Sequence, residues 1–288
     1  MDSHLRKLAA AQAEVVATWQ LREPGWSWHR IQHQARTRGW WRIHAGVYVL
    51  SQAPPSRIQL WWAAALTTPH SFLSHGSAAA CFGFHRFDKG FEVITRPGTG
   101  GRRRAGRLVV FRSKCLESET TRHLGIPITS AERVLVDIVP GLDDRRAGRA
   151  FREAIRLRTT TAARVLRCVE RHGGAPAGLA SLARRYGNLP YARTRSDAEG
   201  RALEVLHDAG IAPPRVNVVV AGEEADLVWT DRKLIVEVDG PQYHRFGDED
   251  ARKEARWRKA GFTVRRAPSG LVYDDAAAFA ALAGRYPA

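Results

Sequence analysis

The stretch that decides the fold reads EEADLVWTDRKLIVEVDGPQYH and runs from Glu223 to His244. Two short runs rich in Val, Ile, Leu and Trp flank a polar break at 230–233, a pattern typical of a β-hairpin. With the turn centred in that break, antiparallel pairing would place Asp226 directly opposite Glu237. Side chains alternate between the faces of a strand, so Glu237 and Asp239 would share the face of Asp226.

Three carboxylates gathered on apolar strands need a source of opposite charge. Cross-strand neighbours lie roughly 5 Å apart, and like charges facing each other destabilise a sheet. A divalent cation would relieve the repulsion, and carboxylate oxygens suit Mg²⁺ or Mn²⁺. The sequence therefore predicts a metal site with Asp226 and Glu237 as ligands. The alternative is an edge hairpin whose acids simply point into water.

The sequence on both sides of the hairpin extends this pattern. Upstream, Ser196–Glu199 has the form of a capping box at the start of a helix, and downstream a charged helix over 250–260 precedes the strand-like GFTVRR. In the order and spacing of these parts, residues 196–288 resemble the Vsr-type mismatch endonucleases of the PD-(D/E)xK superfamily. The resemblance implies a mixed sheet flanked by helices. Glu199 would be a further acid near the site, although helix capping alone also explains it.

The same resemblance implies magnesium- or manganese-dependent hydrolysis of nucleic-acid phosphodiesters. Asp226, Glu237 and the backbone carbonyl of Val238 would hold the metal. The lysine that the superfamily usually has two residues after the second acid is replaced here by Asp239. His244 matches the residue that Vsr-like relatives use as general acid or base, and Asp239 would orient it or bind a metal.

The net charge of +16 is unevenly distributed along the chain. Residues 1–140 carry +10 and residues 141–195 carry +9, whereas residues 196–288 carry −3. Lys and Arg contacts to phosphate supply most of the non-specific affinity of proteins for nucleic acids. We therefore expect a nucleic-acid partner, with duplex DNA as the first candidate, bound mainly by the upstream part of the chain.

Length and composition exclude several classes of protein. Hydrophobic residues make up 44% of the 288 residues and nine residues are Trp, which argues for folded cores and against disorder. No apolar run approaches the roughly 18 residues of a membrane span, and the N-terminus lacks the apolar core of a secretory signal. Cys81, Cys115 and Cys168 are far apart and lack metal-binding spacing, so we expect reduced thiols in a cytoplasmic protein.

Residues 1–50 have the pattern of a winged helix-turn-helix. Helices are expected over 5–16 and 17–22, and a third from Ser27, its expected N-cap, to residue 37. Trp28 and Ile31 would face inward. The segment WWRIHAGVYVL predicts a hairpin, the wing. The polar side chains left for phosphates or base edges are Arg30, Gln34, Arg36 and Arg38 on the third helix and Arg42 on the wing.

The segment Gly46–Tyr48 in the wing resembles the N-terminal domain of AbiEi-family antitoxins, which implies DNA binding and a toxin as a further partner. The alternative is a small helical domain that docks onto the rest of the chain. His29 and His33 lie four residues apart, a spacing that can hold zinc. Because the pattern shows no third ligand, we expect these histidines to be polar surface or to contact phosphate.

Residues 51–140 predict an α/β region. Apolar helices are expected over 58–66 and after Ser74, and an amphipathic helix after Thr129 or Ser130. The segments FEVITRP and RLVVFRS alternate like strands, and the Gly-rich segment between them predicts a flexible hairpin tip. The tip would present four basic residues to a nucleic-acid backbone: Arg102, Arg103, Arg104 and Arg107. The Gly-Ile-Pro and Thr-Ser that precede the last helix also resemble AbiEi-like proteins.

Residues 141–190 predict Arg-rich helices, which would form either a basic platform for a duplex or a solvated connector. Residues 191–288 form the nuclease-like domain. We thus expect an α/β protein, α+β overall: a winged helix, a mixed middle region, the connector and a restriction-endonuclease-like sheet. In the last domain, Arg252 and Arg256 of the charged helix would hold DNA against the metal site. The expected function is metal-dependent cleavage of DNA, in phage defence or a toxin–antitoxin system. The alternative is an antitoxin-like transcriptional regulator whose nuclease fold is inactive.

Overall fold

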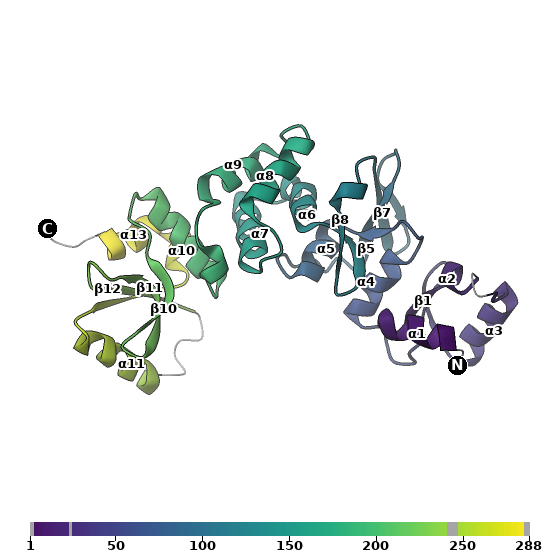
Figure 1. The fold of residues 1–288 in the computed structure, drawn as a ribbon, viewed down its shortest axis with the longest axis horizontal. Coiled ribbons are helices and arrows are strands. Elements are labelled where there is room, and N and C mark those ends of the chain that lie inside the picture. Colours follow the sequence, from purple (N-terminus) through teal and green to yellow (C-terminus); the bar gives the residue numbers. More distant parts are fainter. Residues whose placement is uncertain (1–2, 23–24, 241–246, 285–288) are drawn as a thin grey trace. The chain divides into compact units, whose positions relative to one another are not determined.

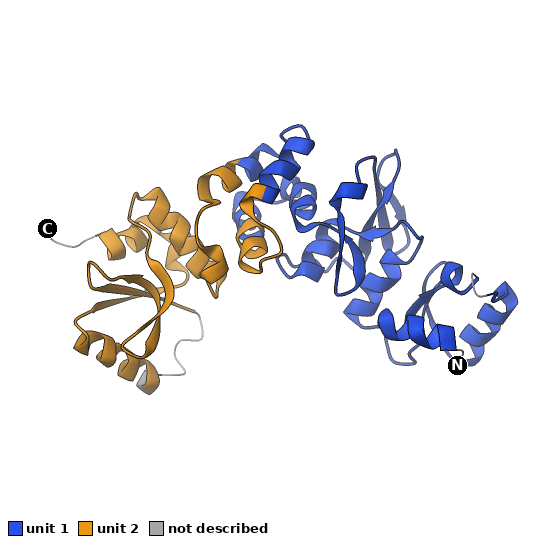
Figure 2. Ribbon diagram, viewed as in Figure 1, with its two compact units in different colours: residues 1–150, 164–180 blue, residues 151–163, 181–288 orange. Residues whose placement is uncertain are grey.

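A computed structural model describes residues 3–22, 25–240 and 247–284 (Figure 1). The chain divides into two compact units, of which the first comprises residues 1–150 and 164–180 and the second residues 151–163 and 181–288 (Figure 2). Helices and mixed sheets occur in the molecule together, so the predicted α/β class is confirmed. In the described part of the chain, no helix combines the length and the apolar character that crossing a membrane requires.

The N-terminal domain is a winged helix-turn-helix in its element order. It contains α1 (Ser3–Ala11), β1 (Val15–Ala17), α2 (Thr18–Arg22), α3 (Trp28–Thr37), β2 (Trp41–His44) and β3 (Val47–Val49). The hairpin predicted as the wing is present, and β1 pairs antiparallel with its β3 strand to give a sheet in the order β1-β3-β2. Side chains from the helices and the sheet share one core.

The first helix ends five residues earlier than the sequence predicted. The chain leaves α1 after Ala11, and Ala13 and Glu14 adopt positive φ angles of 51° and 64°. Val15 then pairs with Val49, and all three residues of β1 are buried. Two consecutive β-branched residues fit this buried sheet edge better than a helix.

Helix α3 begins where expected, but Trp28 points into solvent and not into the core. The Ser27 hydroxyl accepts a hydrogen bond from the Arg30 N–H, as an N-cap does. Ile31 is buried, whereas Trp28 is 51% exposed, so the prediction that it faces inward is wrong. Trp26, just before the helix, joins the core cluster in its place.

The middle region is built on a six-stranded sheet in the order β6-β7-β5-β4-β9-β8. Two helices, α4 (Arg57–Ala65) and α5 (His75–Phe82), precede most of its strands, and α6 (Ala131–Ile138) follows them. The Ser130 hydroxyl accepts a hydrogen bond from the Arg133 N–H and caps α6. The strands are β4 (Phe72–Leu73), β5 (Glu92–Pro97), β6 (Arg103–Ala105), β7 (Leu108–Ser113), β8 (Thr120–His123) and β9 (Ile126–Thr129), with a 3-10 turn, η1 (Glu117–Glu119), before β8.

The predicted hairpin between β5 and β7 is wrong. These two strands pair in parallel, Val93 with Val109, and the chain between them adds β6 as the antiparallel edge strand next to β7. Parallel neighbours cannot be joined by a tight turn, so the Gly-rich segment serves as the crossover. Arg103 and Arg104 therefore lie on an exposed edge strand, with Arg102 just before it, and not at a loop tip.

Three helices predicted from the Arg-rich pattern are present: α7 (Asp144–Arg156), α8 (Ala162–Arg171) and α9 (Ala177–Tyr186). Short 3-10 turns lie before and after them, η2 (Val139–Gly141) and η3 (Tyr191–Arg193). Arg152, near the end of α7, is buried and donates to Asp197 Oδ1 at 2.9 Å and to Glu204 Oε2 at 2.9 Å. The Tyr191 hydroxyl donates to Glu204 Oε1 at 2.8 Å. The end of α7 is thus anchored to α10 (Asp197–Asp208) within the second unit.

The second unit holds a four-stranded sheet in the order β10-β11-β12-β13. Its strands are β10 (Arg215–Val220), β11 (Glu223–Trp229), β12 (Leu234–Asp239) and β13 (Thr263–Pro268), and the helices that follow α10 are α11 (Gly247–Lys259), α12 (Leu271–Asp274) and α13 (Ala276–Gly284). The first three strands are antiparallel, and β13 is parallel to β12. Trp257 of α11 is buried against Ala225, Val228 and Ile235 of the central hairpin.

Loss of the Arg152 side chain should destabilise the second unit. Replacing Arg152 by Met removes the buried guanidinium that Asp197 and Glu204 share, and leaves Glu204 with the less buried Arg201, at 2.9 Å, as its guanidinium partner. Breaking a buried ion pair in this way costs up to about 3–5 kcal/mol. Urea unfolding measures the loss. The matched control is Arg146→Ala on the same helix, because that side chain is 70% exposed beside Asp143 and its removal should cost at most about 1 kcal/mol. Equal effects of the two substitutions would contradict the anchoring role.

Candidate functional site

The central hairpin brings Asp226 and Glu237 together at the end of its ladder. Backbone pairing runs from Trp229–Leu234 to Leu227–Val236, and one residue further along each strand Asp226 lies opposite Glu237. There the pattern of hydrogen bonds changes. The Asp226 N–H donates to Glu237 Oε1 at 2.9 Å, and the Val238 N–H donates to Asp226 Oδ2 at 2.8 Å. Each acid therefore satisfies a backbone donor of the opposite strand.

Burial makes this pair of acids electrostatically costly. Burial raises the pKa of Asp226 to about 6, with nearby Glu199 and Asp239 adding to the shift, while the Val238 N–H opposes it. Burial and, after it, the charge of Asp226 raise the pKa of Glu237 to about 7. Two carboxylates that resist ionising at one place are typical of sites that bind a cation or transfer a proton.

The charge of a lysine on helix α11 acts on both acids. Lys253 lowers the pKa of Asp226 and of Glu237 through its charge, which places its ammonium group within electrostatic range of the two carboxylates. Its Nζ also lies 5.3 Å from the ring centroid of Trp257. Trp257 is the fourth residue after Lys253, so the two side chains share one face of the helix, and the buried tryptophan fixes the orientation of that face. The sequence interpretation missed Lys253, although this spacing was a readable signal.

Asp239 has a partner that the sequence analysis did not foresee. Both of its oxygens accept hydrogen bonds from Arg266 of β13, at 2.9 Å each. Arg266 also approaches Asp250 Oδ2 at 3.8 Å and Glu254 Oε2 at 3.7 Å. A bidentate guanidinium holds a carboxylate firmly. Asp239 therefore anchors Arg266 of β13, which in turn pairs with two acids of α11. His244, the predicted general acid or base, lies outside the described residues.

Glu199 lies close enough to Asp226 to raise its pKa, but its own oxygens are occupied. It accepts hydrogen bonds from the Arg195 N–H, the Ser196 hydroxyl and Asn217 Nδ2, at 2.9, 2.9 and 2.7 Å. The Ser196 hydroxyl in turn accepts from the Glu199 N–H, as an N-cap does. Glu199 therefore caps α10 and ties it to β10.

The oxygens that remain for a metal belong to Asp226 and Glu237. Within the part of the chain that the structure describes, Asp226 Oδ1 and Glu237 Oε2 have no hydrogen-bond partner. Two carboxylate oxygens with raised proton affinity suit a hard divalent cation. The described acids Asp226, Glu237 and Asp239 do not, however, form a set of three ligand atoms within 4.8 Å of one another.

The residues predicted to contact nucleic acid lie on α3 and the wing, and on two further surfaces. Arg36 and Arg42 are exposed. Arg38 Nε donates to Gln34 Oε1 at 2.6 Å, and the Arg30 guanidinium stacks 3.9 Å from the Trp26 ring centroid. A hydrogen bond of 2.6 Å from Gln32 to the Tyr48 hydroxyl joins the helix to the wing. Elsewhere Arg102, Arg103, Arg104 and Arg252 are exposed, and Arg256 forms an ion pair with Glu223.

No protein-family model and no curated protein matches this chain. Functional inference therefore starts from the arrangement of its own residues.

The raised pKa values predict how stability of the metal-free protein changes with pH. The folded-state pKa of Glu237 is about 7 against an ordinary 4.5, so the folded protein keeps protons that the unfolded chain has released between these values. Its free energy of unfolding should fall as pH rises through this window. In Glu237→Gln we expect the fall between about pH 5 and pH 8 to be smaller by about 2–3 kcal/mol, because the wild-type pKa rises from 4.5 to about 7 and each pKa unit corresponds to about 1.4 kcal/mol.

Urea unfolding at about pH 5 and pH 8 in the presence of a chelator measures both proteins. The matched control is Glu170→Gln, since that side chain is exposed on α8. It should leave the pH dependence of the wild type unchanged. Identical pH profiles for the wild type and Glu237→Gln would contradict the raised pKa of Glu237.

Proposed function

We propose that this protein binds DNA and hydrolyses its phosphodiester bonds with a divalent metal ion. The observation that carries the proposal is the pair Asp226 and Glu237 at the end of the β11–β12 ladder, each with one oxygen directed to a backbone N–H and one left over. A pair of acids with a purely structural role would need only the hydrogen bonds to backbone N–H groups, and not the two oxygens left without a partner in the described part of the chain. The resemblance of residues 196–288 to Vsr-like nucleases supports the same reaction.

Asp226 Oδ1 and Glu237 Oε2 are the oxygens that would hold Mg²⁺ or Mn²⁺, with the Val238 carbonyl as a further ligand. The backbone hydrogen bonds keep both carboxylates in place without the ion. The bound ion would polarise the phosphate and lower the pKa of an attacking water. Ionisation of both acids, which burial opposes, becomes favourable when a cation is present.

Lys253 supplies the positive charge that the superfamily's usual lysine would provide, because Asp239 stands at the position of that lysine. Its ammonium group lies within electrostatic range of the two acids and can donate hydrogen bonds to a phosphate oxygen that gains charge during the reaction. Asp239 and Arg266 act behind it, because their bidentate pair holds β12 and β13 together beside α11. His244 remains the candidate for proton transfer to or from the reacting groups.

Binding to the duplex is assigned to the first unit. Helix α3 presents its polar face, including Arg36, and the wing presents Arg42. A helix of this kind enters the major groove in helix-turn-helix proteins, while arginines contact phosphates. Exposed Arg102, Arg103 and Arg104 offer additional phosphate contacts along the edge strand β6.

A second function is favoured by one specific contact. Arg266 occupies both oxygens of Asp239, at the place where the related nucleases carry their lysine. A protein that no longer catalyses the reaction could keep such a pair for stability alone. It would then act as an antitoxin-like transcriptional regulator that binds DNA and a toxin, with an inactive nuclease fold.

Plasmid nicking with Mg²⁺ or Mn²⁺ separates these two functions. We expect the full chain to nick supercoiled plasmid and Glu237→Gln to be inactive. Lys253→Met should nick at least about a hundredfold more slowly, the usual effect of removing a preorganised donor to developing charge. The control, Lys259→Met, removes an exposed lysine from the same helix and should match the wild type. Metal-independent nicking, or full activity of Glu237→Gln, would contradict the proposed reaction; an inactive wild type would favour the regulator.

DNA binding is tested separately, by the salt dependence of affinity for a duplex. The double substitution Arg36→Ala and Arg42→Ala should weaken binding and flatten the plot of log K against log salt, by about one for each arginine that bound a phosphate. Lys89→Ala, which removes an exposed lysine from the α5–β5 loop, serves as the control with an unchanged slope. An unchanged slope in the double variant would remove α3 and the wing from the DNA-binding surface.

A further inference from the structure

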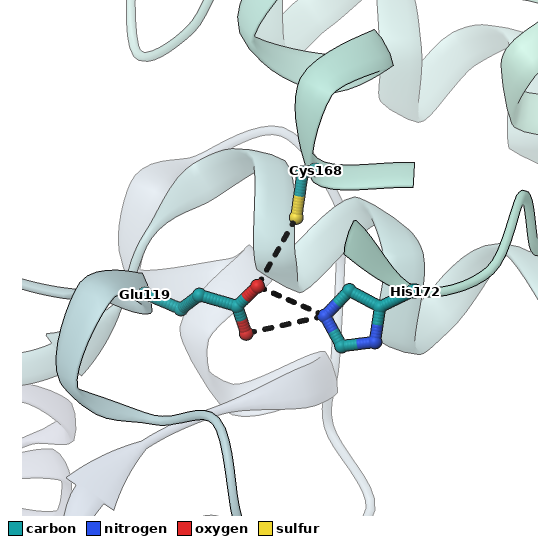
Figure 3. A group of neighbouring side chains, drawn as sticks. All are labelled: Glu119, Cys168 and His172. Carbon is teal, nitrogen blue, oxygen red and sulfur yellow. Dashed lines mark hydrogen bonds and ion pairs between the residues drawn. The ribbon is translucent and has the colours of Figure 1, made fainter. Parts of the chain in front are cut away.

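Three side chains with metal-binding atoms meet inside the first unit (Figure 3). Glu119 ends the short turn η1 before strand β8, Cys168 lies on α8, and His172 follows the last residue of that helix. Their carboxylate oxygen, thiol sulfur and ring nitrogen all lie within 4.8 Å of one another. Cysteine with histidine is a typical donor set for zinc, and a carboxylate commonly completes it.

The distances between these atoms lie within about 0.4 Å of the edges of a zinc tetrahedron. With Zn–S near 2.3 Å and Zn–N and Zn–O near 2.0–2.1 Å, the ligand atoms lie about 3.5 Å apart for sulfur and oxygen and about 3.3 Å apart for nitrogen and oxygen. Cys168 Sγ lies 3.7 Å from Glu119 Oε1, and His172 Nε2 lies 2.9 and 3.2 Å from the two Glu119 oxygens. We propose that Glu119, Cys168 and His172 bind one zinc ion.

The local fold holds the ligands in this arrangement. Cys168 and His172 are four residues apart, and the His172 N–H donates to the Cys168 carbonyl at 3.2 Å, so both side chains leave the same face of one helical turn. Glu119 and Cys168 are buried, whereas His172 is partly exposed. Zinc would therefore enter from the side of His172, and three protein ligands leave one position for water or an exchangeable group.

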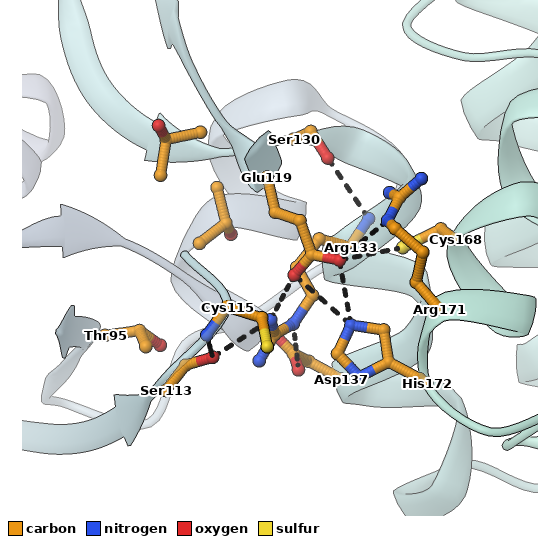
Figure 4. A network of polar contacts seen from close by, with 12 residues as sticks. Thr95, Ser113, Cys115, Glu119, Ser130, Arg133, Asp137, Cys168, Arg171 and His172 are labelled. Atoms are coloured by element: carbon orange, nitrogen blue, oxygen red, sulfur yellow. Dashed lines mark hydrogen bonds and ion pairs between the residues drawn. The ribbon is translucent and has the colours of Figure 1, made fainter. Parts of the chain in front are cut away.

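Arg133 orients the carboxylate from behind (Figure 4). It donates to Glu119 Oε2, and its Nε donates to Asp137 Oδ1 at 2.8 Å, which balances its charge. This contact leaves Oε1 facing Cys168 and approached by His172. Metal sites commonly hold the non-ligating oxygen of a carboxylate in this way through an outer-shell hydrogen bond.

Arg171 is the competing cation at this site. Its Nε lies 3.4 Å from Glu119 Oε1, the oxygen that zinc would take. The Arg171 side chain is 45% exposed, so it can turn into solvent when the ion binds, and a partly exposed ion pair is weak. The site also differs chemically from Asp226 and Glu237, because thiol and imidazole favour zinc whereas carboxylates alone favour magnesium.

Cobalt titration of the full, chelator-treated protein tests the proposal, because a cobalt–thiolate bond has its own absorption in the near ultraviolet. We expect the band to reach its maximum at one equivalent of Co²⁺ and to disappear when Zn²⁺ is added. Cys168→Ser should abolish the band. The matched control, Cys115→Ser, removes an exposed thiol and should keep it. Absence of the band in the wild type, or its disappearance in Cys115→Ser alone, would overturn the proposal.

Two further variants keep the test informative if Cys168→Ser does not fold. His172→Gln keeps the thiol and should weaken cobalt binding by more than the about ten- to hundredfold that removal of an outer-shell partner costs. Arg171→Ala removes the competing cation and should tighten binding. Unchanged affinity in His172→Gln, or weaker binding in Arg171→Ala, would contradict the site. The readout is spectroscopic and independent of nicking, so the outcome does not depend on the proposed nuclease activity.

Discussion

Two backbone N–H groups at the end of the β11–β12 ladder bind side-chain carboxylates where carbonyl groups would ordinarily accept. The reason lies in two requirements that must be met at the same place. A buried N–H needs an acceptor, and a buried carboxylate needs a donor. Both requirements are met because the carboxylates of Asp226 and Glu237 each accept a hydrogen bond from a backbone N–H of the opposite strand. What remains is the cost of burying two acids side by side. Burial raises both pKa values, the charge of Asp226 adds to the rise for Glu237, and both effects favour the approach of a cation.

The neighbouring elements bring cations to that place. Trp257 anchors α11 against the hairpin and thereby positions Lys253, while Arg266 on the parallel strand β13 binds Asp239. The hairpin thus supplies the acidic side chains. Helix α11, which connects β12 to β13, and strand β13 supply the positively charged side chains. A site built in this way depends on packing between elements more than on any one segment of sequence.

Arginine has a second use in this protein, inside the fold. Arg152 joins α7 to α10 through Asp197 and Glu204, and Arg133 joins Glu119 to Asp137. The planar guanidinium suits this purpose because it offers several donors in a fixed geometry. The net charge of +16 already counts the acids that pair with these arginines, so the pairing leaves it unchanged. In the Arg-rich helices, Arg152 and Arg156 are paired with acids, which favours the connector over the basic platform for this part of α7.

The sequence by itself determined the features that depend on neighbouring residues. Ser27, Ser130 and Ser196 cap their helices because each hydroxyl meets an N–H three residues on. The opposed position of Asp226 and Glu237 follows from the turn and from the alternation of side chains. Tertiary structure alone decided the pairings between distant segments, among them the addition of β1 to the wing and the parallel alignment of β5 with β7. It also decided the partners of Asp239 and the meeting of Glu119 with Cys168, since no local rule relates side chains that lie tens of residues apart. Periodicity fixes which face of an element is buried, but the element that covers this face is chosen by the packing of the whole unit.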